Sequence, residues 1–89
     1  MRFEWDRDKA VSNCNKHGVP FDEAVTVFYD PLAATFGDPD HSVEEDRLIT
    51  LGYSGQGRLL VVCPTERSGA IRIISVRRAT ARERKRHEG

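Results

Sequence analysis

Hydrophobic and polar positions follow two different periods along the chain, and the change separates a helical first third from a strand-rich remainder. In residues 21–28 the apolar positions recur at helical spacing, as expected for a helix with one buried face. Residues 59–62 and 71–76 are almost continuously apolar, which is typical of central strands. The pattern therefore predicts helices near the N-terminus and a sheet built mainly from the second half.

Capping residues set the limits of the two N-terminal helices. Asp6 is a good N-cap for a helix that runs to Lys16 and His17, and Gly18 is a good stop signal after it. A second helix is predicted to start just after Pro20. It ends before Pro31, because the residue preceding a proline is disfavoured in helical conformation.

Five short strands are predicted, and turn signals separate those in the second half of the chain. They cover residues 3–5, 32–36 (weakly), 47–53, 58–63 and 70–76, with turns at 38–40, 54–57 and 68–69. Pro64 cannot donate to a ladder and should mark a strand end or a bulge. Thr80 and Glu83 form a capping box that begins a short C-terminal helix. The order predicts one α+β domain over residues 1–89, with a central antiparallel sheet and helices packed on one face.

Length and composition place the chain among small folded domains. Its 89 residues can bury only a modest core, so oligomerisation or a bound partner would add stability. The chain contains neither an apolar run of about eighteen residues nor a signal-peptide pattern, which predicts a cytoplasmic protein without a membrane contact. Cys14 and Cys63 lie far apart without zinc-ligand spacing, so we expect reduced structural thiols, no metal site and no cofactor.

Charge is strongly segregated although the net charge is zero. Residues 1–46 hold four Lys or Arg against eleven Asp or Glu, a net of −7, and residues 47–89 hold ten against three, a net of +7. Nine of those ten cations are arginine, whose planar guanidinium binds phosphate through two parallel hydrogen bonds. A polyanion is the natural partner of the basic half. Three functions remain open at this point: an enzyme acting on nucleic acid, a non-enzymatic nucleic-acid-binding module, and a protein-interaction module whose acidic and basic halves dock complementary partners. The two halves could also simply neutralise each other through ion pairs within the fold.

Segments along almost the whole chain resemble the BrnT toxins, a family with the RelE-like ribonuclease fold. The resemblance rests on these residues: Phe3–Asp6, Lys16–Val19, Phe21, Glu23, Ala24, Asp30, Pro31, 40–42, Glu45, Arg47, Gly52, the run at 60–62, 65–67, 71–75, 77–79 and Glu83. It implies an RNA-cleaving toxin that inhibits translation and forms a homodimer. It also implies a BrnA-type ribbon-helix-helix antitoxin that neutralises the toxin. The toxin would contact operator DNA only through this antitoxin.

Metal-free RNA cleavage requires fixed cations for the transition-state charge and groups that transfer protons. Arg67, Arg77 and Arg78 are the candidate phosphate clamps, and we expect them to converge from the ends of two neighbouring strands. Arg77 and Arg78 are adjacent in a strand, so both can face one phosphate only if the strand bends or the helix begins there. Ion pairs with the acidic half are the alternative role.

Candidate proton-transfer groups are fewer. His17, at a helix C-terminus, could act as acid or base or serve only as a cap, and Glu66 could act as a base or orient Arg67. His41 suggests a turn rather than a metal site, and His87 falls in a tail expected to fray. Trp5 is expected in the core or a dimer interface rather than stacked on a base. RNA-binding candidates outside the catalytic set are Lys16, Arg72 and Arg82.

Overall fold

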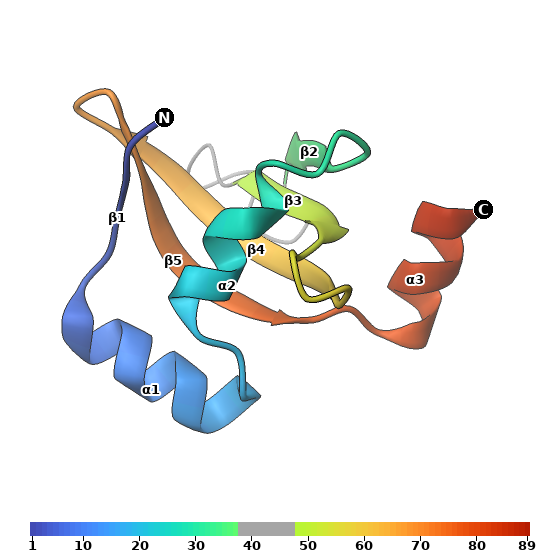
Figure 1. The fold of residues 1–89 in the computed structure, drawn as a ribbon, viewed down its shortest axis with the longest axis horizontal. Coiled ribbons are helices and arrows are strands. Elements are labelled where there is room, and N and C mark those ends of the chain that lie inside the picture. The colour runs from blue at the N-terminus through green and yellow to red at the C-terminus, as the bar shows by residue number, and fades with distance from the viewer. Residues whose placement is uncertain (38–47) are drawn as a thin grey trace.

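The computed structural model describes residues 1–37 and 48–89 and forms a layered α+β domain (Figure 1). Its helices are α1 (Arg7–His17), α2 (Phe21–Val27) and α3 (Ala81–Glu88). Its strands are β1 (Phe3–Glu4), β2 (Ala34–Gly37), β3 (Leu48–Tyr53), β4 (Leu59–Arg67) and β5 (Ala70–Arg78). The turn predicted at residues 38–40, with His41 after it, lies outside the described residues. Within those residues, none of the helices is long and apolar enough to cross a membrane.

The five strands form one sheet in the order β1-β5-β4-β3-β2. Strands β2 to β5 pair antiparallel in sequence order, which confirms the predicted meander. β1 differs from this pattern because it pairs parallel to β5, with Phe3 opposite Ile71. The long connection between them allows a parallel pairing, since a hairpin can join only antiparallel neighbours. The sheet is therefore mixed, with its antiparallel part at the centre.

The predicted capping interactions fix both ends of α1 and the start of α3. The Asp6 carboxylate accepts the backbone N–H of Lys9 at 3.1 Å, and Gly18 adopts a left-handed conformation, φ 71°, that costs glycine little. Thr80 and Glu83 form the expected reciprocal capping box. α2 begins directly after Pro20, as predicted. These local signals were sufficient to define the helices because each end satisfies backbone groups that the helix leaves free.

The main core lies between the sheet and the two N-terminal helices. Its fully buried members come from both layers: Val19, Phe21, Ala24, Val27, Leu60, Val62, Ile73 and Val76. Trp5 packs against this core with its ring edge-on to that of Phe21, at 5.9 Å between centroids. Of the two places expected for Trp5, the core or a dimer interface, the structure shows packing against the core.

A buried amide holds α1 against β5. Asn13 donates to the carbonyl of Val76 at 2.9 Å and accepts the N–H of the same residue at 3.2 Å. Asn13 is only 8% exposed, so these bonds satisfy backbone groups that water does not reach. They fix the position of the whole first helix along the last strand.

An irregularity in the β4–β5 hairpin changes which side chains share a face. The register shifts between Cys63 and Pro64, which pair with Ser75 and Ile73, so Ile74 is an extra residue in β5. The prediction that Pro64 marks a bulge is confirmed. Both strands continue beyond their predicted ends, to Arg67 and Arg78, because a bulge bends a ladder without terminating it.

α3 corrects the expectation that all helices pack on one face. Side chains from α3 lie beside Ile49, Leu51 and Val61, which belong to a second apolar cluster on the side of the sheet away from α1 and α2. The capping box predicts where α3 begins but carries no signal for which face it covers. We call the two sides the α1/α2 face and the α3 face.

Candidate functional site

The pairing of β4 with β5 assigns the late arginines to faces of the sheet. Residues directly opposite in an antiparallel pair point to the same side. Arg77 lies opposite Val61, a member of the α3-face cluster, and Arg78 lies opposite Leu60, a member of the main core. Arg77 therefore points to the α3 face and Arg78 to the α1/α2 face, so the two side chains do not meet at one phosphate.

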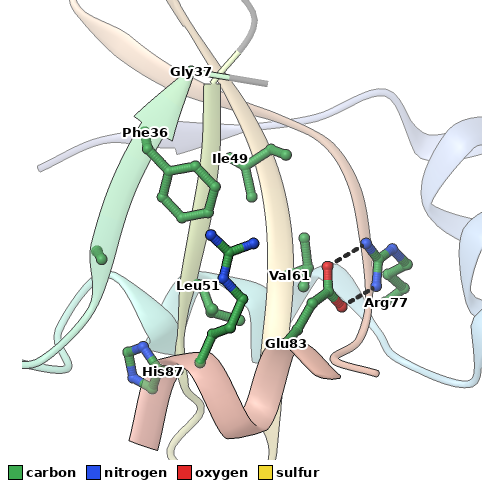
Figure 2. Close-up of a pocket in the computed structure, with 10 residues that line it drawn as sticks. Phe36, Gly37, Ile49, Leu51, Val61, Arg77, Glu83 and His87 are labelled. Carbon is green, nitrogen blue, oxygen red and sulfur yellow. Dashed lines mark hydrogen bonds and ion pairs between the residues drawn. The ribbon is translucent and has the colours of Figure 1, made fainter. Parts of the chain in front are cut away.

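A hollow of about 510 Å³ lies between α3 and the sheet (Figure 2). Phe36, Ile49, Leu51 and Val61 project into it from β2, β3 and β4, so its floor is apolar. Its polar groups come from the end of β5 and from α3: Arg77, Glu83, Arg86 and His87. Cationic and titratable groups placed above an apolar floor are typical of a ligand-binding site.

The Arg77 guanidinium is oriented by a two-point ion pair. Its Nη1 and Nη2 atoms donate to the Glu83 carboxylate at 2.8 and 2.9 Å, and Figure 2 shows the fork. The Arg77 hydrogen bonds, together with the Thr80 backbone N–H, lower the pKa of Glu83 from 4.5 to about 2 despite partial burial, so the carboxylate stays charged. The Arg77 side chain remains 40% exposed, which leaves part of the guanidinium open to a ligand.

The C-terminal turn of α3 places an imidazole beside the hollow. The rings of His87 and Tyr53 lie 6.0 Å apart, and the Tyr53 hydroxyl donates to the Glu88 carboxylate. The hydrogen bond from Tyr53 to Glu88 raises the pKa of the phenol. These contacts hold the last turn against β3, so the expectation that His87 lies in a frayed tail is wrong.

Arg67 lies at the other end of the β4–β5 ribbon, which overturns the expected convergence of the three arginines. It pairs with Ala70 beside the hairpin turn, whereas Arg77 pairs with Val61, six positions earlier in β4. At about 3.3 Å per residue the two arginines are about 20 Å apart along the ribbon. Figure 1 likewise places the β4–β5 turn far from α3. One phosphate cannot contact both side chains.

Glu66 is also separated from its expected partner. It pairs with Ile71, whose side chain packs against the main core, so Glu66 points to the α1/α2 face while Arg67 points to the other. Both residues are exposed. The structure does not bring Glu66 and Arg67 together, because adjacent positions in a strand face opposite sides.

His17, Lys16 and Arg78 belong to the α1/α2 side of the molecule. His17 ends α1 and is partly buried, and Lys16 is exposed one residue earlier. The contacts of Asn13 bring the last turns of α1 to the end of β5, where Arg78 lies two positions beyond Val76. These three residues are separated from the hollow by the sheet.

A buried ion pair explains the one deeply buried carboxylate of the described chain. Glu23 is 4% exposed and receives hydrogen bonds from the Arg58 side chain, at 2.8 Å from Nε, and from the Ser54 hydroxyl at 2.7 Å. Arg58 is the main cause that lowers the pKa of Glu23, with a smaller contribution from the charge of Arg78. The network joins α2 to the β3–β4 turn, and its donors and acceptors are mutually satisfied. We assign it a structural role.

Arg72 and Arg82 occupy two further positions. Arg72 lies in β5 with Nη1 3.7 Å from a Glu4 carboxylate oxygen, and Arg82 is exposed in the first turn of α3.

In residues 1–37 and 48–89, no group of three or more His, Cys, Asp or Glu is arranged to hold a metal ion. Cys14 and Cys63 are free and partly buried.

The interpretation of the sequence missed Phe36 and His87, and it offered Arg86 only as one of several cations on the last helix that could bind RNA phosphates. Glu83, Arg86 and His87 stand at helical spacings of three and four, so the sequence already placed them on one side of α3. Phe36 gave no comparable signal, because a single aromatic in a weak strand predicts neither its face nor its neighbours. The register of β2 against β3 places Phe36 opposite Ile49 and so over the hollow.

Comparisons with known proteins agree with this architecture. A family model described as the ribonuclease toxin, BrnT, of type II toxin–antitoxin systems matches residues 5–83, so the chain belongs to the BrnT family. The crystal structure of the Brucella abortus ribonuclease toxin, BrnT, is similar, with 26% sequence identity and a TM-score of 0.70. The match covers 90% of this chain and 97% of that one. A search of curated proteins finds no match.

Membership of the family confirms the resemblance drawn from the sequence segments and the α+β fold class. The family is one of ribonuclease toxins, and toxins of type II systems act with an antitoxin, so an antitoxin partner and an RNA target belong to its description.

Proposed function

We propose that this chain is an endoribonuclease that cleaves RNA without a metal ion, and that cleavage takes place in the hollow on the α3 face. The observation that carries the proposal is the composition of that hollow. Two arginines, of which Arg77 is paired with Glu83, and one histidine surround an apolar floor that includes an aromatic ring. A nucleotide has matching parts, since its phosphate is anionic and its base has flat apolar faces that stack on aromatic side chains.

The chemistry divides among three of the lining residues. Arg77 and Arg86 supply fixed positive charge for the phosphorane-like transition state, and preorganised charge is usually the largest contribution to such catalysis. His87 supplies an imidazole, the side chain that most often transfers protons in catalysis. Arg77 remains the candidate for binding the phosphate, as the sequence predicted. His87 replaces His17 and Glu66 as the candidate for proton transfer, because it lies on the same face as Arg77.

The proposed cleavage step requires no reactant other than RNA and water. His87 accepts the proton of the ribose 2′-hydroxyl, and the 2′-oxygen forms a bond to phosphorus while the bond from phosphorus to the 5′-oxygen breaks. The departing 5′-oxygen takes a proton from water, and His87 returns its own proton to solvent. The products are a 2′,3′-cyclic phosphate and a 5′-hydroxyl.

Several wider properties of the proposal come from the family. We infer that RNA cleavage inhibits translation in the cytoplasm and that the toxin forms a homodimer. A BrnA-type ribbon-helix-helix antitoxin neutralises it and supplies the contact with operator DNA. Support for these points is the family match itself.

The test is cleavage of single-stranded RNA in the presence of EDTA by the purified toxin. Arg86→Ala and His87→Ala are expected to reduce the cleavage rate at least about 100-fold, the lower range for losing one general acid–base or one transition-state donor. Lys85→Ala is the matched control, because Lys85 is exposed and lies on the side of α3 opposite to Glu83, Arg86 and His87. Circular dichroism verifies that each variant is folded.

Three results would contradict the proposal. Loss of activity in EDTA that Mg²⁺ restores would contradict metal independence. Full activity in both Arg86→Ala and His87→Ala would mean that cleavage does not take place on the α3 face. Salt-sensitive RNA binding without cleavage would favour a non-enzymatic binding module instead.

A further inference from the structure

The α3 face of the β4–β5 ribbon continues beyond the hollow as a polar surface. Its side chains are Cys63, Thr65 and Arg67 from β4 and Arg72 and Ser75 from β5, and we call these five residues the β4–β5 strip. Thr65 and Arg67 are exposed and the other three are partly exposed. The strip is therefore open to solvent, whereas Ile73 and Val76 on the opposite side of β5 are buried in the main core.

The bulge at Ile74 aligns the arginines of this ribbon on one face. Arg72 and Arg77 are five positions apart, which in a regular strand would place them on opposite sides. The extra residue in β5 reverses the alternation, so Arg72 pairs with Thr65 and Arg77 with Val61 on the same side of β4. Arg67 is on that side as well, two positions beyond Thr65. Arg77, Arg72 and Arg67 thus follow one another from the hollow to the hairpin turn.

The charge on the strip is positive. Its two cations are arginines, and among the described residues Arg72 has a Glu4 carboxylate oxygen 3.7 Å from its Nη1. The Glu4 side chain is 39% exposed, and an ion pair so open to water contributes little and is easily replaced by a phosphate. The five side chains of the strip are small, polar or cationic, although the apolar Ile74 is exposed at the bulge beside them, so the strip itself offers charge and hydrogen bonds to a hydrated polyanion.

We propose that the β4–β5 strip is a phosphate track that holds the single-stranded RNA extending from the hollow, with Arg72 and Arg67 each contacting one backbone phosphate. This inference rests on the proposed ribonuclease function and names its substrate class. The ribbon spans about 20 Å between Arg77 and Arg67. A fully stacked strand rises about 3.4 Å per nucleotide, so this length holds at most about six nucleotides on one side of the scissile bond, and fewer if the strand is extended. Arg67 is then a binding residue, because it lies too far from the hollow to touch the reacting phosphate.

The experiment measures affinity without cleavage. The probe is a single-stranded oligonucleotide of about twelve residues, long enough for the track, with every 2′-hydroxyl methylated so that the 2′-oxygen cannot attack. Its dissociation constant is measured by fluorescence anisotropy at several salt concentrations. For single strands, each phosphate contact contributes about 0.7 to the slope of log affinity against log salt. Arg67→Ala and Arg72→Ala are each expected to lower the slope by about 0.7, and the double variant by about 1.4.

Two variants distinguish a phosphate contact from a general change of charge. Arg7→Ala removes the same charge from α1, on the other side of the sheet, and is expected to leave the slope unchanged. Arg67→Lys keeps a cation at the hairpin and is expected to retain most of the wild-type slope. A dinucleotide probe, too short to reach Arg67 from the hollow, should bind wild type and Arg67→Ala equally.

The outcomes separate this inference from the proposed function. If wild type cleaves RNA but Arg67→Ala and Arg72→Ala bind the long probe with an unchanged slope, the track is wrong and the ribonuclease assignment stands. If the two variants lower the salt slope no more than Arg7→Ala does, the track is also wrong. The same holds if a duplex binds more tightly than the single strand. If wild type does not cleave RNA and yet both variants lower the slope as expected, the track stands and the ribonuclease proposal fails.

Discussion

Glu83→Gln is expected to loosen α3 from the sheet. The carboxylate of Glu83 accepts two hydrogen bonds from Arg77 and one from the Thr80 backbone N–H. Glutamine can still complete a capping box, so the substitution removes the ion pair while preserving the helix start. Any change in the behaviour of α3 therefore reports the contact between Arg77 and Glu83.

The size of the effect follows from the pKa of Glu83. A fall from 4.5 to about 2 corresponds to about 3 kcal/mol of preference for the charged carboxylate in the folded state. The side chain is 31% exposed and screened by water, so we expect about 1–2 kcal/mol of docking free energy at neutral pH. Because the folded-state pKa is lowered, this stabilisation is present above about pH 4.5 and is lost as the pH falls towards 2.

Limited trypsin digestion measures the loosening directly. α3 contains four basic residues that trypsin recognises, Arg82, Arg84, Lys85 and Arg86, and a docked helix must open locally before it is cut. At pH 8, Glu83→Gln is expected to increase cleavage within α3 about 5- to 30-fold, the ratio that corresponds to 1–2 kcal/mol. Glu66→Gln removes an exposed carboxylate at the other end of the ribbon and serves as the control.

Two results would refute this reasoning. Equal rates of α3 cleavage in Glu83→Gln and wild type would mean that the ion pair does not hold the helix. An NMR titration in which the Glu83 carboxyl titrates near 4.5 rather than near 2 would mean that Arg77 does not stabilise its charged form.

Two further predictions concern the packing of the α1/α2 face, and chemical denaturation measures both. Gly52→Ala is expected to destabilise the fold by about 1–3 kcal/mol, because its new Cβ would lie 2.8 Å from that of Ala33. Gly37→Ala is the control and should have a smaller effect, because no atom lies within 4 Å of its new Cβ. Equal losses of stability in the two variants would contradict the steric cause. Asn13→Ala is expected to cost about 1–3 kcal/mol by leaving two buried backbone groups of β5 without partners, whereas exposed Asn15→Ala should cost less than about 0.5 kcal/mol.

Local features of the fold were predictable because they depend on neighbours in sequence. Asp6, Gly18 and the Thr80 capping box mark helix ends through backbone groups only a few residues away. The parallel pairing of β1 was not predictable in this way. A two-residue strand has no measurable period, and its partner lies at the far end of the chain.

The separation of Arg67 from Arg77 was available from the sequence and was misjudged. A turn at residues 68–69 makes β4 and β5 an antiparallel hairpin, so a residue just before the turn and one at the end of β5 must lie at opposite ends. The shared face of Arg72 and Arg77 was not available, because it depends on one extra residue at Ile74. A contiguous apolar run gives no sign of where a bulge will fall.

The candidate site was only half predictable for a similar reason. Helical spacing groups Glu83 with Arg86 and His87, but it does not specify which surface the group will face. That depends on the direction in which the chain leaves β5, and on Phe36 and Ile49 reaching the same hollow from β2 and β3. Long-range packing of this kind requires the tertiary structure.

The position of β5 has a consequence for the synthesis of this protein. β5 hydrogen-bonds to β1 and β4 and contributes Ile73 and Val76 to the main core, yet residues 70–78 are translated only after β1 to β4. A nascent chain that stops before Ala70 lacks the strand that joins its first residues to the rest. Such a chain is therefore unable to complete the five-stranded sheet, and the domain can reach its folded state only after β5 has been synthesised.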